Sequence, residues 1–111
     1  MYKIDSDLIE MTRGDSVPFN FKLVDSNNNP VELADKDVLL FTVRKKPKKN
    51  SEDTNYAFQK QIVNGSFKIS PNDTKDLDYG QYNWDIEYRY NAGDDVETVL
   101  KGKLVLTEEV T

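Results

Sequence analysis

The sequence predicts an all-β fold, an immunoglobulin-like β-sandwich of about seven antiparallel strands with one short helical turn. Two observations lead to this prediction. Apolar residues alternate with polar ones along most of the chain, which is the pattern of half-buried strands. The segment Asp78–Trp84, DYGQYNW, also has the form of a tyrosine corner, in which a Tyr near the start of a strand binds the backbone of the preceding turn. At 111 residues the chain fits one such domain, spanning residues 1–111.

The expected strands begin near the N-terminus. Leu8–Thr12 is a short first strand that ends at Gly14. In the next strand, residues 15–25, four apolar side chains share a face: Val17, Phe19, Phe21 and Leu23. Pro18 cannot donate to a strand ladder, so this strand should begin at an edge or a bulge. The Asn-rich segment Asp25–Pro30 then predicts a turn.

A third long strand is expected at Val38–Lys45, where Leu39, Phe41 and Val43 share a face. A polar loop continues from its end through Asn55. Further along, Asn64-Gly65 predicts a hairpin, because a type I′ turn needs positive φ at both central residues. The two strands that it joins are residues 56–63 and 66–70.

A short helical turn should follow this hairpin. Ser70 is a suitable N-cap, Pro71 suits the first helical position, and Asp73 places a carboxylate three residues after the cap. One or two turns of helix would then run through Leu77 and end at the tyrosine corner.

The last two expected strands are the longest. In residues 82–90, one face carries Tyr82, Trp84, Ile86, Tyr88 and Tyr90. Asn91–Asp95 makes the turn, and residues 97–108 return with an inward face of Leu100, Gly102, Leu104 and Leu106. Asp78, Gly80, Tyr82 and Trp84 are therefore expected to be structural. In antibody domains a disulfide cysteine stands two residues after the corner Tyr, and here that position is Trp84.

Composition argues against several classes of function. Cys and His are both absent, which removes disulfides, thiolate or imidazole metal ligands and the commonest general base. We therefore predict no enzyme activity, no catalytic residues, no cofactor and no metal. The net charge of -5 disfavours a nucleic-acid partner. No apolar run is long enough to span a membrane, and the N-terminal residues do not form a secretory signal, so synthesis in a cytosol and no membrane partner are expected.

Two groups of residues are candidates for contact with a partner. Five basic residues lie close together in sequence: Arg44, Lys45, Lys46, Lys48 and Lys49. They could bind an acidic protein face, or phosphate and acidic lipid, or they could form a solvated strand end that discourages edge pairing. Tyr88 and Tyr90 lie toward the end of their strand, where they could be exposed as a contact surface; burial in the core is the alternative for this stripe.

The order of motifs along the chain resembles small phage and prophage structural proteins of Gram-positive bacteria. The motifs are TRGDS at 12–16, FxFxL at 19–23, SPxDT at 70–74 with Leu77, Gly80 and Tyr82 following, and TxxxGxL at 98–104. The layout is similar to the immunoglobulin-like N-terminal domain of phage baseplate upper proteins.

This resemblance implies a virion component of the tail, baseplate or capsid that acts by protein contacts and has no catalytic role. It would be made in the cytoplasm of the bacterial host and assembled into the virion, with other virion or tail proteins, including copies of itself, as partners. The alternative is a carbohydrate-binding or cell-surface-binding immunoglobulin-like module that uses the exposed Tyr residues and the loops.

Overall fold

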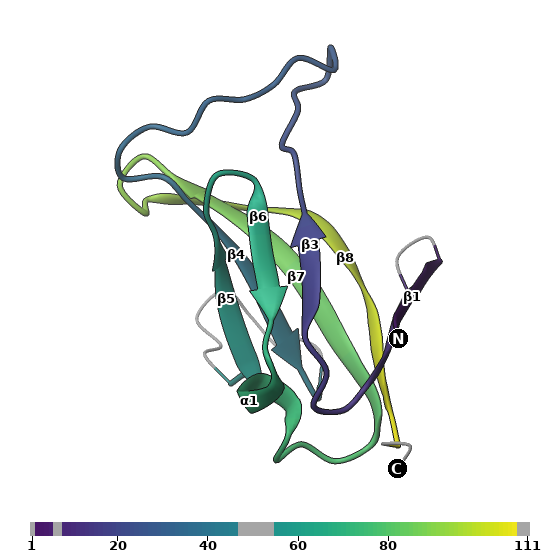
Figure 1. Cartoon of the computed structure of the whole chain (residues 1–111). Helices are drawn as coiled ribbons and strands as arrows, with labels where there is room; N and C mark the ends of the chain where they lie inside the picture. Colours follow the sequence, from purple (N-terminus) through teal and green to yellow (C-terminus); the bar gives the residue numbers. More distant parts are fainter. Residues whose placement is uncertain (1, 6–7, 47–54, 109–111) are drawn as a thin grey trace.

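The computed structural model describes residues 2–5, 8–46 and 55–108, and strands dominate this part of the chain (Figure 1). In chain order the elements are β1 (Tyr2–Asp5), β2 (Leu8–Thr12), β3 (Val17–Asn20), β4 (Val38–Arg44), β5 (Phe58–Ile62), β6 (Ser66–Ile69), α1 (Pro71–Thr74), β7 (Gly80–Tyr90) and β8 (Asp95–Thr107). The four residues of α1 are the whole helical content of the described residues, and none of it could cross a membrane.

The strands form two sheets. The larger has the order β1-β2-β8-β7-β4-β5, and the smaller pairs β3 with β6. Figure 1 shows β3 and β6 crossing in front of the larger sheet. All pairs are antiparallel except β2–β8, which is parallel. The prediction of antiparallel strands throughout was therefore wrong for this pair. A parallel pair needs a long connection, and here the rest of the domain provides it.

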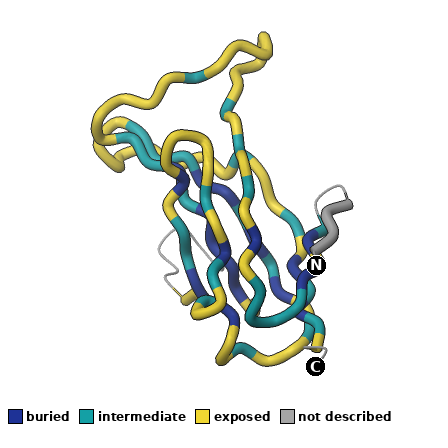
Figure 2. The backbone as a smooth tube through the Cα atoms, in the orientation of Figure 1, coloured by how far each residue is buried: buried dark blue, intermediate teal, exposed yellow. Residues whose placement is uncertain are grey.

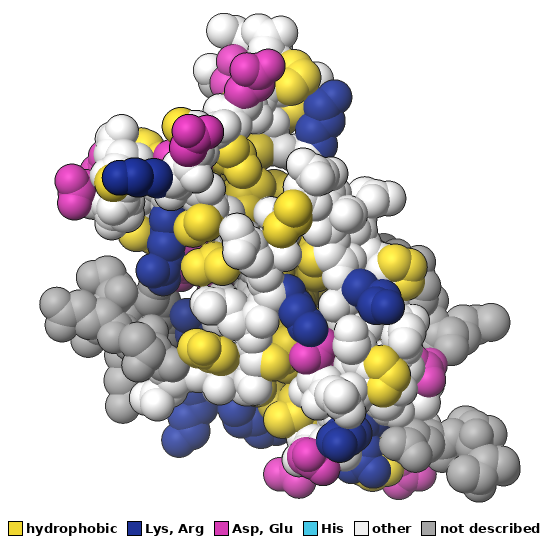
Figure 3. Space-filling view, turned by 60° about the vertical axis from the view of Figure 1, so that its left-hand side comes forward, with side chains coloured by type: hydrophobic (Ala, Val, Ile, Leu, Met, Phe, Trp, Pro, Cys, Tyr) yellow, Lys and Arg dark blue, Asp and Glu magenta, His cyan; other side chains and the backbone are white. Residues whose placement is uncertain are grey.

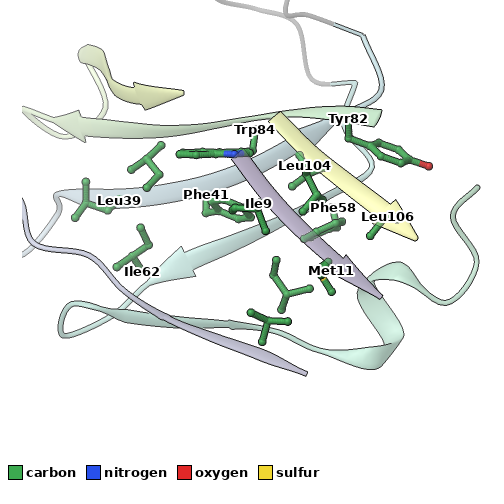
Figure 4. Packing of buried hydrophobic residues seen from close by; sticks show 14 residues of the cluster. Ile9, Met11, Leu39, Phe41, Phe58, Ile62, Tyr82, Trp84, Leu104 and Leu106 are labelled. Carbon is green, nitrogen blue, oxygen red and sulfur yellow. The ribbon is translucent and has the colours of Figure 1, made fainter. Parts of the chain in front are cut away.

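The hydrophobic core lies between the two sheets, and Phe41 of β4 is near its centre (Figure 4). Its ring centroid is 4.6 Å from that of Phe67 on β6 and 5.7 Å from that of Trp84 on β7. Phe19 of β3 stacks on Phe67 at 5.0 Å. Burial of each large apolar side chain stabilises the fold by about 1.5–3 kcal/mol, so this aromatic cluster holds the two sheets together.

The β3 strand is shorter than predicted, but its alternation persists. Pairing stops at Asn20, while Phe21 and Leu23 beyond it still pack against the core. The Phe21 N–H instead donates to the Gly65 carbonyl at 2.8 Å. Pro18 lies in the small sheet, where β3 has a single neighbour strand, as expected for a residue that cannot donate to a ladder.

The Asn64-Gly65 turn is present, with φ of 53° and 76° at its two central residues. A Cβ at Gly65 would lie 3.3 Å from the Phe21 carbonyl oxygen, which adds a steric reason for glycine. Only Val63 and Ser66 pair across the turn. β5 continues into the larger sheet and β6 into the smaller one. The predicted hairpin is thus a tight turn that carries the chain from one sheet to the other.

The helical turn begins as predicted, with the Ser70 N–H donating to the Asp73 carboxylate at 2.7 Å. Thr74 is fully buried, and its hydroxyl accepts a hydrogen bond from the Gly14 N–H at 2.9 Å. The Arg13 guanidinium donates to the Leu77 carbonyl at 3.1 Å. These two bonds attach the β2–β3 turn to the segment that leads into β7.

The hydrogen bond of a tyrosine corner is also present. The hydroxyl of Tyr82, a side chain only 3% exposed, donates to the Asp78 carbonyl at 2.8 Å. Gly80, between them, has φ of 125°, which side chains other than glycine rarely adopt. Two residues after the Tyr, the Trp84 ring lies in the core and its Nε1 donates to the Lys103 carbonyl at 3.0 Å. The corner and the adjacent indole therefore fix the start of β7.

A β-bulge changes the outer half of the β7–β8 hairpin. Ile86 is opposite Leu100 and Glu87 is opposite Thr98, which leaves Val99 as the extra residue. Val99 packs against the core, whereas Leu100 is 44% exposed. The prediction that Leu100 points inward was wrong, since its side chain is largely exposed at the position of β8 next to the bulged Val99. Figure 2 shows that the hairpin end beyond this point is mostly exposed.

Replacing Trp84 by Ala should reduce the free energy of unfolding by about 3–5 kcal/mol, the usual cost of a large deletion in a core. Leu100→Ala on the neighbouring strand is the control, and its exposed side chain should change that free energy by less than about 0.5 kcal/mol. Urea denaturation of both variants measures the difference. Equal costs for the two variants would contradict the core position of Trp84.

Replacing Tyr82 by Phe should cost about 1–2 kcal/mol, because it removes the hydrogen bond to Asp78 and keeps the ring. Burial, and then the charge of Asp78, raise the pKa of Tyr82. The folded state therefore favours the neutral phenol. The stability that this preference adds is fully present below about pH 10 and is lost as the pH rises above the pKa of the folded state. Denaturation at pH 7 and pH 11 should show a smaller difference between wild type and Tyr82→Phe at the higher pH. An unchanged midpoint at pH 7 would contradict the corner.

Candidate functional site

The predicted contact residues lie at the two ends of β7, not together. Lys45 is beside Gly80, at the start of β7, with its Nζ 3.7 Å from where a Cβ of Gly80 would be. Tyr88 and Tyr90 are at the other end of the same strand. The strand rise separates the two places by roughly 25 Å. Lys48 and Lys49 lie outside the described residues.

Arg44 is not on the surface. It is 4% exposed, and its guanidinium pairs with the Asp85 carboxylate of β7 at 2.5 Å. The last residue of β4 is still opposite Asn83 in the ladder, which brings its side chain beside Asp85. The sequence analysis grouped Arg44 with the exposed lysines that follow it. Arg44 is instead buried, because it is the last residue of β4 and the lysines come after the strand. We therefore remove Arg44 from the candidate contact surface and assign it a structural ion pair.

Lys45 and Lys46, which we call the basic end, are exposed. Lys45 Nζ lies over the Tyr82 ring, 4.6 Å from its centroid, and within 3.5 Å of the Gln81 carbonyl. This cation–π contact holds Lys45 against the tyrosine corner. Lys46 makes no ion pair or hydrogen bond with any other described residue. Its ammonium is therefore the freer of the two cations at this end.

At the opposite end, Tyr88 and Tyr90 stack on each other with ring centroids 4.7 Å apart. Both side chains are half-buried. The Tyr88 hydroxyl donates to the Asp37 carboxylate at 3.0 Å, and the same carboxylate oxygen accepts the Ala34 N–H at 3.0 Å. Burial, followed by the hydrogen bond to Asp37, raises the pKa of Tyr88. The pair is thus held in place by the turn before β4.

Carboxylates surround this pair of rings. Glu97 is the cross-strand partner of Tyr88, and Asp95 is that of Tyr90, so both lie beside the rings on the same face. Asp95 also accepts a hydrogen bond from the Asn91 side chain. We call Tyr88, Tyr90, Asp37, Asp95 and Glu97 the acidic–aromatic surface. Its three acidic members were not predicted as site residues. The predicted turn at Asn91–Asp95 joins the two strands whose pairing places Asp95 and Glu97 opposite the tyrosines.

A hollow of about 650 Å³ adjoins the acidic–aromatic surface. It is lined by residues 34–37, which include the cation Lys36, and by Tyr88, Tyr90, Asn91 and Ala92. Figure 3 shows acidic, basic and scattered apolar side chains on the projecting upper part of the molecule. Aromatic faces bordered by carboxylates attract cations. The chemistry of this end therefore suits a basic group better than an acidic one.

A second hollow, of about 850 Å³, lies along β7 and β8 beside the Arg44–Asp85 pair. Lys101 and Lys103 line it, and the Lys103 ammonium donates to the Asn83 side chain at 2.5 Å. Of the charged groups of this hollow, Arg44 and Asp85 bind each other and Lys103 binds an uncharged amide. Among residues 2–5, 8–46 and 55–108 no group of three or more acidic side chains is placed to hold a metal ion.

Replacing Arg44 by Ala should reduce the free energy of unfolding by about 3–5 kcal/mol, because the Asp85 carboxylate would lose its guanidinium in a mostly buried position. Lys46→Ala, two residues along the chain, is the control, and we expect a change of less than about 0.5 kcal/mol. Thermal or urea denaturation compares the two variants. A cost for Arg44→Ala as small as that of the control would mean that the ion pair has no structural role.

The two ends of β7 thus carry surfaces of opposite charge, the basic end and the acidic–aromatic surface. Neither the protein-family models nor the curated protein sequences give a significant match to this chain.

Proposed function

We propose that the chain is an immunoglobulin-like domain. Three features support this assignment. The order β8-β7-β4-β5 corresponds to strands G, F, C and C′ of such a sandwich, and β3 with β6 corresponds to B and E. The tyrosine corner lies at the start of β7, the strand that corresponds to F, as it does in that fold.

In antibody domains a disulfide between strands B and F joins the two sheets. Here the corresponding strands are β3 and β7, and the chain has no cysteine. Phe19 of β3, Phe67 of β6, Phe41 of β4 and Trp84 of β7 form a connected aromatic cluster across the sheets instead. Such packing does not depend on an oxidising compartment, which suits a domain that folds in a bacterial cytoplasm.

On this fold we propose a non-enzymatic structural protein of a phage or prophage virion, a tail, baseplate or other virion component that binds proteins rather than nucleic acid or membrane. The observation that carries this proposal is the acidic–aromatic surface, where two stacked tyrosines are half-buried at the free end of a hairpin. Tyr is enriched at protein interfaces. A Tyr side chain that is already held in place loses little conformational entropy when a partner binds. The motif order supports the assignment to phage proteins.

A carbohydrate-binding or cell-surface module is the second candidate. The hollow beside Tyr88 and Tyr90 favours it, because aromatic side chains and a few fixed polar groups commonly line small-ligand sites. Binding to a glycan array that is lost in Tyr88→Ala and Tyr90→Ala, and retained in the control Tyr56→Ala, would support this function. Tyr56 is suitable because it is exposed and lies outside the acidic–aromatic surface.

The virion assignment is tested by locating the chain in particles. Prophage induction in the bacterium that carries the gene, followed by density-gradient purification and mass spectrometry, should find the chain in the particle fraction at a fixed ratio to a major tail protein. A deletion strain should release fewer or incomplete particles. A chain found in the soluble fraction alone, with intact particles from the deletion strain, would overturn the proposal.

A further inference from the structure

We propose that copies of this chain associate head to tail, with the acidic–aromatic surface of one copy binding the basic end of the next. This inference rests on the proposed structural function and names a partner for it. It starts from a sheet face that lacks a facing sheet. Tyr88 packs at the edge of the core and is bound to the turn before β4, and Tyr90 continues the same face beyond it, half-buried.

The chemistry of this face selects a cationic partner. The stacked rings are bordered by the carboxylates of Asp37, Asp95 and Glu97. A cation over a tyrosine face would be attracted both by the ring and by these carboxylates. The chain itself uses this kind of contact twice at the other end of the domain. Arg13 lies 4.2 Å over the Tyr79 ring, and Lys45 lies 4.6 Å over the Tyr82 ring. Tyr88 and Tyr90 stack on each other, and no cation lies over either ring in the described part of the chain.

The complementary group in the same molecule is the basic end. Lys46 is exposed and Lys45 is fixed beside it. Because roughly 25 Å of β7 separates this end from the acidic–aromatic surface, Lys45 and Lys46 cannot reach the acidic–aromatic surface of their own copy. A second copy can. Two different patches then meet at each contact, so the interface is heterologous and produces a ring or an open filament rather than a closed two-fold dimer.

The acidic–aromatic surface is already ordered for such a contact. The Tyr88 hydroxyl is bound to Asp37, which is in turn bound to the Ala34 N–H. Stacking on Tyr88 orients the Tyr90 ring. Little side-chain freedom is left to lose when a lysine docks, and this lowers the cost of association.

The test uses two variants of the full chain, each with one end neutralised. Lys45→Ala with Lys46→Ala removes the basic end, and Asp95→Asn with Glu97→Gln neutralises the acidic end without changing its shape. Sedimentation velocity and light scattering measure the mass at rising concentration. Wild type should grow beyond a dimer at low salt, and the growth should weaken as the Debye length falls from about 10 Å at 0.1 M salt to about 3 Å at 1 M.

Each variant alone should remain a monomer, and an equimolar mixture should form a 1:1 dimer and stop there, because each partner contributes one working end. Lys22→Ala, which removes an exposed cation elsewhere, should behave as wild type. Circular dichroism melting curves confirm that all variants are folded. A wild type that stays monomeric at every concentration, or a mixture that forms no dimer, would overturn the inference.

These outcomes are separate from those of the particle experiment. A chain that is present in virions but monomeric in this test keeps the proposed function and loses the head-to-tail contact. A chain that forms such assemblies but is absent from virions keeps the contact and loses the virion assignment.

Discussion

The whole structure depends on the packing of Phe41 between its aromatic neighbours on four other strands. With no cysteine in the chain, close packing, and not a disulfide bond, holds the two sheets together. Phe67 approaches Phe41 from the small sheet and Trp84 approaches it from the next strand of the large sheet. Because β3 and β6 form a sheet of only two strands, which is marginal alone, the small sheet is stable only while its aromatic face stays against Phe41.

Polar contacts then fix the ends of the strands that this core holds together. Tyr82 anchors the start of β7, and Thr74 and Arg13 tie the turn after β2 to the segment before β7. The Arg44–Asp85 pair belongs to the same group of structural contacts, since it neutralises two charges between neighbouring strands. Most of these bonds lie at one end of the molecule. The opposite end, beyond the bulge at Ile86, has more exposed side chains.

Strand β7 connects the structural end to the exposed end. Its first half carries the corner and the indole, and its second half carries the two stacked tyrosines. The length of the strand keeps the basic end and the acidic–aromatic surface apart, and the head-to-tail contact that we propose depends on this separation.

The sequence alone determined the elements whose signals are local: the strands at Leu8–Thr12 and Val38–Arg44, the Asn64-Gly65 turn, the helix start at Ser70 and the corner at Tyr82. Each depends on residues within a few positions of one another. The tertiary structure decided the parallel β2–β8 pair, the passage of β5 and β6 into different sheets, the burial of Arg44 and the exposure of Leu100. It also brought Asp37 to Tyr88, which lies 51 positions further along the chain. These features depend on which distant strands pair and in what register, and alternation along one strand contains no information about its partner.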